Sequence, residues 1–386
     1  MASRPKSTRQ SGNKDKFSFR LKQLEINNFK GIDQIVLDFL PPRMRDDPDI
    51  YVMGSRNGIG KTSILEACSL LFLAALSGTR FAHGSEQDAF VRFSEMFVRS
   101  GSESADISGI FYINAEDVKF TIQLDKSGKI SVGGDKEKIY KFFEPYRKRM
   151  YDDLTERFLT LLTGHYMEPV IMPPCLYFHS YRKVQEGKPE LGMMLEHDMM
   201  FKRRIIRSPY SRMSIQSSEN SYVSIFKLQI LRAMMGRANL FDLLDSSDNA
   251  DETFDKINNL IERYAGGTID KLRPSTDNTL DFRITQKKGG VSFAFDGLSS
   301  GQKEIISTLF LIWHYSKDQP CLILIDEPEL HLNAEWHRDF VQQVYQIAPE
   351  NQYIFATHSN EMFSSVKDER RLFIGAKQIT MMEKLQ

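Results

Sequence analysis

A short apolar run, a glycine-rich turn and a helical segment follow one another between residues 50 and 76, an order typical of a phosphate-binding loop. The turn at residues 55–62 reads SRNGIGKT and departs from the usual pattern in having serine at the first glycine position. Its glycines let backbone N–H groups converge on phosphate oxygens, and the helix that follows directs its N-terminus at the same charge. Lys61 is expected to contact the β- and γ-phosphates, and Thr62 to bind Mg²⁺. The predicted nucleotide-binding residues of this segment are Asn57, Gly58, Gly60, Lys61, Thr62 and Ser63.

An apolar run that closes on two carboxylates lies later in the chain. Residues 322–328 read LILIDEP. A charged pair at a strand end is commonly just solvated, but an apolar strand that ends in Asp-Glu-Pro after a phosphate-binding loop favours a catalytic role. We predict that Asp326 helps to hold Mg²⁺ and that Glu327 polarises the attacking water as general base.

Two further segments complete the series. Residues 298–302 read LSSGQ and open a helix, where a serine hydroxyl and glycine N–H groups form an anion site or, in the simpler alternative, an ordinary helix cap. His358 follows the apolar run at residues 353–356. A neutral imidazole at a strand end can hydrogen-bond to a phosphate oxygen and respond to hydrolysis.

The order of these segments resembles that of ABC-class ATPases, which carry a Walker A loop, an L-S-G-G-Q signature, a Walker B strand and a switch histidine. Three details are similar to the branch of this class that contains SMC, RecF and OLD proteins. The first is the opening hairpin around residues 26–31, which read INNFKG. The second is the long stretch between Thr62 and Leu298, and the third is the run EPELHL at residues 327–332.

The resemblance implies an α/β fold, namely an ABC-type P-loop ATPase with an N-terminal antiparallel β subdomain and a mainly helical insertion between Walker A and the signature motif. It also implies that two copies sandwich ATP, so that Ser299, Gly301 and Gln302 of one copy face the γ-phosphate held by the other. His358 is then a catalytic residue. Two candidates rest on position alone: Lys30 in the opening hairpin, and Gln185 as the Q-loop glutamine, for which a surface role is an equal alternative.

The chain is expected to divide into four parts. Residues 1–16 form a disordered basic tail, and residues 17–181 form an ATPase lobe with the P-loop and a β meander. A helical insertion follows at residues 182–265, and residues 266–386 carry the signature, Walker B and switch-histidine part of the ATPase.

Hydrophobic periodicity gives the expected elements. Alternation predicts a hairpin over residues 17–39, a meander over 107–132, a strand over 171–178 and a hairpin over 280–295. Alternating helices and strands in the last part predict a parallel sheet. Helical spacing predicts helices over residues 136–162, 221–244, 252–264, 302–315 and 334–347.

Composition limits the partners. The chain has 51 basic and 51 acidic residues, so no overall positive field recruits nucleic acid. A nucleic-acid contact must be a local patch, with residues 147–149 and 202–212 as candidates. No apolar run reaches the roughly 18 residues that a membrane helix needs, so we expect a cytoplasmic protein without a membrane partner. The 3 cysteines lie in apolar contexts, which predicts buried thiols and no cysteine zinc site.

We therefore expect an ATPase that binds and hydrolyses ATP with Mg²⁺, forms a homodimer or a higher-order assembly, and acts as sensor or regulator of a separate effector protein, a nuclease, with nucleic acid as a further candidate partner. The compact form resembles the ATPase components of Septu-type and retron-associated anti-phage defence systems. No intrinsic nuclease is expected, because Asp326 and Glu327 are committed to ATP and the residues after His358 are too few for a nuclease fold. Two alternatives stay open: a RecF-like repair ATPase that clamps duplex DNA, and a nucleotide-binding module with negligible turnover, which Glu327 disfavours.

Overall fold

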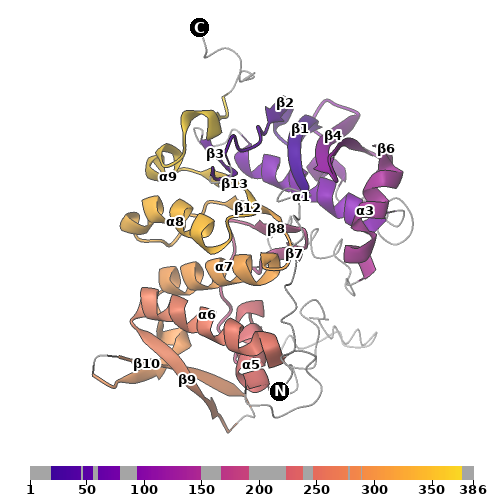
Figure 1. Ribbon diagram of the computed structural model, residues 1–386. Helices are drawn as coiled ribbons and strands as arrows, with labels where there is room; N and C mark the ends of the chain where they lie inside the picture. The colour runs from indigo at the N-terminus through magenta and orange to yellow at the C-terminus, as the bar shows by residue number, and fades with distance from the viewer. Residues whose placement is uncertain are drawn as a thin grey trace, which may run out of the picture.

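A parallel sheet forms the centre of the molecule, with one α/β layer on each side (Figure 1). The structure is a computed structural model that describes residues 19–44, 47–54, 60–78, 94–148, 167–190, 223–237, 247–276, 279–287 and 289–375. The predicted tail at residues 1–16, Asn57, Gly58 and the basic segment at residues 202–212 lie outside the described residues.

The central sheet has six strands in the order β14-β3-β13-β12-β8-β7. Neighbouring strands are parallel, except that β7 runs antiparallel to β8. Side chains of β3 and β12 are buried on both faces, as expected for a parallel sheet covered on both sides. The strands are β3 (Ile50–Gly54), β7 (Val170–Met172), β8 (Cys175–Phe178), β12 (Leu322–Asp326), β13 (Gln352–Thr357) and β14 (Arg371–Phe373).

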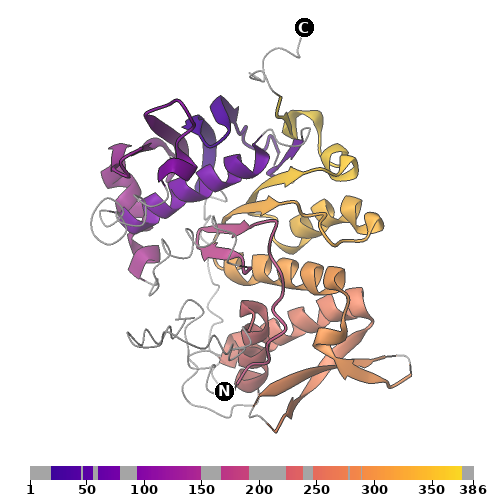
Figure 2. The same ribbon diagram turned by 180° about the vertical axis from the view of Figure 1, so that it is seen from behind.

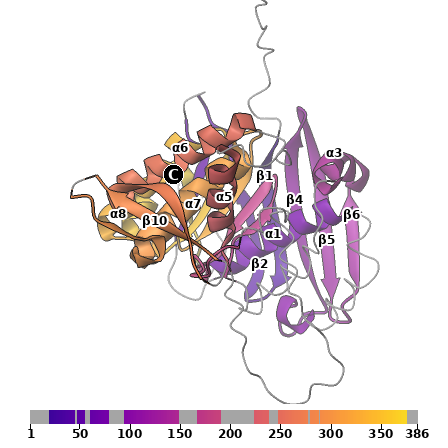
Figure 3. The same ribbon diagram turned by 90° about the horizontal axis from the view of Figure 1, so that it is seen from below.

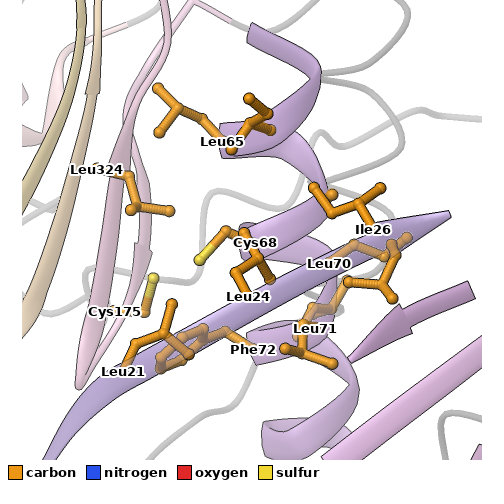
Figure 4. Close-up of a cluster of buried hydrophobic side chains, with 14 of the residues drawn as sticks. Leu21, Leu24, Ile26, Leu65, Cys68, Leu70, Leu71, Phe72, Cys175 and Leu324 are labelled. Carbon is orange, nitrogen blue, oxygen red and sulfur yellow. The ribbon is translucent and has the colours of Figure 1, made fainter. Parts of the chain in front are cut away.

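Helix α1 (Lys61–Ser77) lies between this sheet and a five-stranded antiparallel sheet of order β2-β1-β4-β5-β6. The helix is apolar all round and buried along most of its length, because both of its faces are covered. Figure 4 shows it between side chains of β1 and of the parallel sheet, including Leu24 on one side and Leu324 on the other. The antiparallel strands are β1 (Phe19–Phe29), β2 (Ile32–Asp38), β4 (Ser104–Ile113), β5 (Glu116–Asp125) and β6 (Ile130–Gly134), and α3 (Lys136–Lys148) packs on β5 and α1.

The opposite face of the parallel sheet is covered by helices, which share one hydrophobic cluster with β3, β12 and β13. Figures 2 and 3 show α6 beside α7, with a small three-stranded sheet of order β11-β10-β9 at the far end of the molecule. The elements of this half are α5 (Ile225–Arg237), α6 (Ser247–Ala265), α7 (Ser300–Ser316), α8 (Ala334–Ile347), α9 (Asn360–Ser364), β9 (Gly267–Pro274), β10 (Leu280–Gln286) and β11 (Ser292–Ala294).

The α/β fold class is confirmed, with the N-terminal antiparallel subdomain and with helices between α1 and α7. One element prediction is wrong: residues 171–178 form the two antiparallel strands β7 and β8 instead of one strand. Pro173 and Pro174 separate the strands, because proline has no N–H group to donate to a ladder. The pattern also does not predict β9, whose charged residues obscure its alternation, or the short strand β14.

The structure bears on the predictions for the cysteines and for membrane helices. Cys68, Cys175 and Cys321 are free and buried, as predicted. Among the helices in the described part of the chain, none combines the length and apolarity that crossing a bilayer requires.

The basic run at residues 147–149 is described only at its start, where the Arg147 guanidinium group donates to the Leu76 carbonyl group at 2.6 Å. That arginine therefore covers the end of α1.

Candidate functional site

The predicted site residues follow neighbouring strands of the parallel sheet. Strand β3 leads to Lys61, β12 ends in Asp326 beside Glu327, and β13 is followed by His358. Because β3 pairs with β13 and β13 with β12, all in parallel, the carboxyl ends of these strands meet at one edge of the sheet. Ligands of open α/β sheets bind at this edge.

Direct contacts connect these residues. The Thr62 hydroxyl group donates to the Asp326 carboxylate at 2.9 Å. The Lys61 Nζ atom lies 3.5 Å from His358 Nδ1, and His358 Nε2 lies 3.7 Å from the Glu327 carboxylate. The structure thus brings together five predicted site residues that are distant in sequence.

The phosphate-loop segment is described from Gly60 onward. Gly60 precedes α1 with a φ of 93°, in the left-handed region, and a Cβ atom at this position would lie 3.1 Å from Ile32 Cγ1. Glycine meets both the backbone and the space requirement. Lys61, Thr62 and Ser63 form the first residues of α1, so their N–H groups belong to the helix end where anions bind.

Burial gives this site its electrostatic character. Lys61 is only 6% exposed, and burial lowers its pKa, although the nearby carboxylates of Asp326, Glu327 and Glu329 act in the opposite direction. Burial raises the pKa of Asp326 to about 6, against the hydrogen bond from Thr62. The hydrogen bond from Thr62 therefore does not offset the cost of burying this negative charge, and a bound cation would offset it further.

These residues fit Mg²⁺. This hard cation prefers oxygen ligands, and it uses one or two protein groups together with substrate phosphates. The Asp326 carboxylate and the Thr62 hydroxyl oxygen are such groups, and they lie side by side. In the described ranges no cluster of three or more His, Cys, Asp or Glu residues could hold a metal ion.

The turn that carries His358 is held by Glu329, for which no role was predicted. Its carboxylate accepts hydrogen bonds from the Thr357 hydroxyl group at 2.7 Å and from the backbone N–H groups of His358 and Ser359 at 2.5 and 3.2 Å. Glu329 thus links the loop after β12 to the loop after β13. The signal available in the sequence was the second acid of the EPELHL run.

The signature segment is held by other parts of the chain. Ser299 caps α7, with a reciprocal capping box to Gln302, so the helix cap that was the simpler alternative for this residue is present. The Gln302 side-chain amide donates to the Tyr264 carbonyl group at 2.9 Å, at the end of α6. Gly301 packs on the loop after β12, where an added Cβ atom would lie 2.3 Å from the His331 carbonyl oxygen.

Replacing Gly301 with alanine is expected to lower the free energy of unfolding by about 1 to 3 kcal/mol, a typical cost of overpacking, and to impair ATP hydrolysis. The His331 oxygen is backbone, so the loop or α7 must shift to admit the methyl group. Denaturant unfolding and phosphate release measure the two effects. Gly31→Ala is the matched control, because no atom lies within 4 Å of its added Cβ atom. A Gly301→Ala protein as stable and as active as the unmodified chain would contradict this packing.

Lys30 and Gln185, the two candidates predicted from their position in the sequence, make none of the contacts described above. The Lys30 ammonium group pairs with the buried Glu66 carboxylate of α1 at 2.5 Å, one helical turn beyond Thr62. Its approach to nucleotide stays a prediction. Gln185 is half-buried on the loop that follows β8, and its role as Q-loop glutamine also stays a prediction.

Residues 176–364 match the family model described as "AAA domain, putative AbiEii toxin, Type IV TA system". The "Retron Vc95 probable ATPase" of Vibrio cholerae serotype O1 biovar El Tor is 30% identical over 112 residues, which cover 26% of this chain and 21% of that protein. The DNA replication and repair protein RecF of Lactococcus lactis subsp. cremoris (strain MG1363) is 29% identical over 112 residues, which cover 29% of this chain and 26% of RecF. These matches are to an AAA-type domain, a probable ATPase and RecF, and they are consistent with an ATPase. The alignments span only about a fifth and a quarter of the two relatives.

Solved structures similar to the chain include SMC heads. The Pyrococcus furiosus Smc head domain with an extended coiled coil, bound to the C-terminal domain of ScpA, has a TM-score of 0.49 at 14% identity, covering 90% of this chain and 92% of that one. The SMC head domain from Thermotoga maritima has a TM-score of 0.44 at 14% identity, covering 94% of this chain and 95% of that one.

Proposed function

We propose that the chain binds ATP with Mg²⁺ and hydrolyses it to ADP and phosphate. The observation that carries this proposal is the meeting of Lys61, Thr62, Asp326, Glu327 and His358 at the carboxyl edge of β3, β13 and β12. A helix N-terminus, a buried lysine and a buried carboxylate beside a threonine hydroxyl group are the parts that nucleotide hydrolysis requires.

Each residue has a chemical task in this proposal. Lys61 and the first N–H groups of α1 hold the phosphates, and Asp326 with Thr62 holds Mg²⁺, which when bound would neutralise phosphate charge. Glu327 accepts the proton of the attacking water. Because the Lys61 ammonium group only donates, His358 Nδ1 acts as acceptor, so a neutral ring carries its proton on Nε2, facing Glu327. We propose that this N–H group donates to the γ-phosphate or to the water.

A composite site between two copies is part of the proposal. Gly301 packs on the backbone of His331, and the Gln302 side chain donates to the Tyr264 carbonyl group, while Ser299 is exposed. A capped helix start with a nearby glycine is suited to bind phosphate. We propose that Ser299, Gly301 and Gln302 of one copy bind the γ-phosphate held by Lys61 of the other.

The cellular role that we propose is regulation of a separate effector, a nuclease, in anti-phage defence of the Septu or retron-associated type. The similarity to the retron Vc95 probable ATPase supports this role. The alternative is a RecF-like repair ATPase that clamps duplex DNA, and the similarity to RecF supports it over nearly the same share of the chain. The two roles differ in whether this chain itself grips DNA.

Incubation of the purified chain with Mg²⁺ and ATP tests both parts of the proposal. We expect phosphate release, and we expect plasmid, linear duplex and single-stranded DNA to stay intact until the effector protein is added. Cleavage by the chain alone that disappears with a mutation outside the ATP site would reveal a missed catalytic centre. Tight binding of plain duplex DNA whose affinity falls steeply with salt would favour the RecF-like alternative.

A further inference from the structure

One buried arginine outside the predicted motifs contacts the backbone that carries both acidic residues. Arg182 follows β8, the strand next to β12, and is only 5% exposed. Its Nη1 atom donates to the Asp326 carbonyl group at 2.6 Å, and its Nη2 atom donates to the Glu327 carbonyl group at 3.3 Å. Nη1 also donates to the His179 carbonyl group at 2.9 Å. The guanidinium group therefore fixes the end of β12 to the end of β8.

The same guanidinium group forms a buried ion pair with Glu304 of α7. Glu304 is 6% exposed and accepts a hydrogen bond from the Thr308 hydroxyl group at 3.2 Å. It lies in the second turn of α7, whose first turn carries the signature residues. A single side chain thus connects the signature helix with the backbone of the predicted general base.

The backbone at Glu327 needs such support. Its φ is 46°, in the left-handed region that residues other than glycine enter rarely. The Glu327 N–H group donates to the Ala356 carbonyl group at 2.8 Å, and Arg182 binds the Glu327 carbonyl oxygen. Strained conformations of this kind persist where surrounding contacts determine them. Arginine suits the task, because its charge is permanent and its donors are fixed in one plane.

We propose that Arg182 is a positioning residue for Glu327, and that its ion pair with Glu304 transmits movement of the signature helix to that carboxylate. The inference rests on the proposed ATP hydrolysis. In this proposal the orientation of the Glu327 carboxylate depends on the position of α7. Binding of nucleotide by the signature segment would therefore affect the rate of hydrolysis. Arg182 acts through Glu327 and has no predicted contact with ATP.

The test compares Arg182→Lys and Glu304→Gln in single-turnover hydrolysis, ATP affinity and thermal unfolding. Each variant is expected to slow hydrolysis about 10- to 100-fold, the effect of misplacing a reacting group by about 1 Å, with ATP affinity unchanged. Asp49→Asn is the matched control, because Asp49 is 4% exposed and pairs with Arg20 at 3.0 Å, next to the opposite end of β3. It should lower the melting temperature without changing the single-turnover rate.

Combination with Glu327→Gln separates positioning from general destabilisation. If Arg182 acts through Glu327, Arg182→Lys should slow the Glu327→Gln protein no further, because residues that act as a unit are not additive. Independent, multiplying effects would overturn the inference, as would wild-type rates in both variants, and either result leaves the proposed function intact. Equal rates for Glu327→Gln and the unmodified chain would refute the proposed function itself. If Arg182→Lys does not fold, Glu304→Gln decides the question.

Discussion

Replacing Glu327 with glutamine is expected to slow ATP hydrolysis about 10²- to 10⁴-fold, the usual loss when acid–base help is removed. Glutamine keeps the size of the side chain and cannot accept the proton of the attacking water. Binding of ATP with Mg²⁺ should persist, because Lys61, Thr62 and Asp326 are unchanged. Phosphate release and equilibrium binding of a fluorescent ATP analogue measure the two properties separately.

The contrasting variant is Lys61→Ala, which should lose nucleotide binding itself, since the phosphate charge then lacks its buried cation. The pair of variants distinguishes a catalytic from a binding defect. Glu335→Gln serves as control, because this exposed residue lies in the first turn of α8, beyond the loop that carries Glu329. Turnover by Glu327→Gln at the rate of the unmodified chain would remove Glu327 from the role of general base.

Mixing two inactive variants is expected to restore hydrolysis. A Lys61→Ala copy retains an intact signature segment, and a copy with the bulky change Ser299→Arg retains an intact phosphate loop. In a heterodimer of the two, one composite site consists entirely of unmodified parts. The recovered rate should approach that of one site in each heterodimer, measured after co-expression with two different affinity tags and purification on both.

The heterodimer experiment can also contradict the composite site. Each variant alone must be inactive, and the doubly purified heterodimer must be shown to contain both chains. If such heterodimers form and still release no phosphate, the signature segment does not complete the site of the other copy. If the Ser299→Arg chain hydrolyses ATP by itself, a complete site lies within one chain and the composite site is refuted.

Local sequence patterns predicted much of this molecule because their physical causes are local. The alternation over residues 17–39 reflects a hairpin with one buried face, and β1 and β2 form it. The apolar run before Asp326 reflects a strand buried on both sides, and β12 is that strand. Lys61, Asp326 and His358 each follow one of three parallel strands. Because the carboxyl ends of parallel strands meet at one edge of the sheet, these residues lie close together.

Other features depend on which residues the fold brings together, and no local pattern encodes them. The pairing of β9 with β10 is one of them, because charged residues mask the period of β9. The split of residues 171–178 into β7 and β8 differs, since Pro173 and Pro174 signal it locally. Gly301 appears in the sequence as part of a motif, whereas its close approach to the His331 carbonyl group exists only in the packed structure.

The amino-acid sequence by itself determined the chemistry of the candidate site: a phosphate loop, two acids and a histidine, the groups that nucleotide hydrolysis needs. Tertiary structure alone decided how those groups are held. Glu329 reaches the turn of His358, and Arg182 reaches both the end of β12 and Glu304 on α7. These partners are far apart along the chain, and a buried ion pair or a carbonyl contact depends on distances that arise only when the sheet and its helices pack.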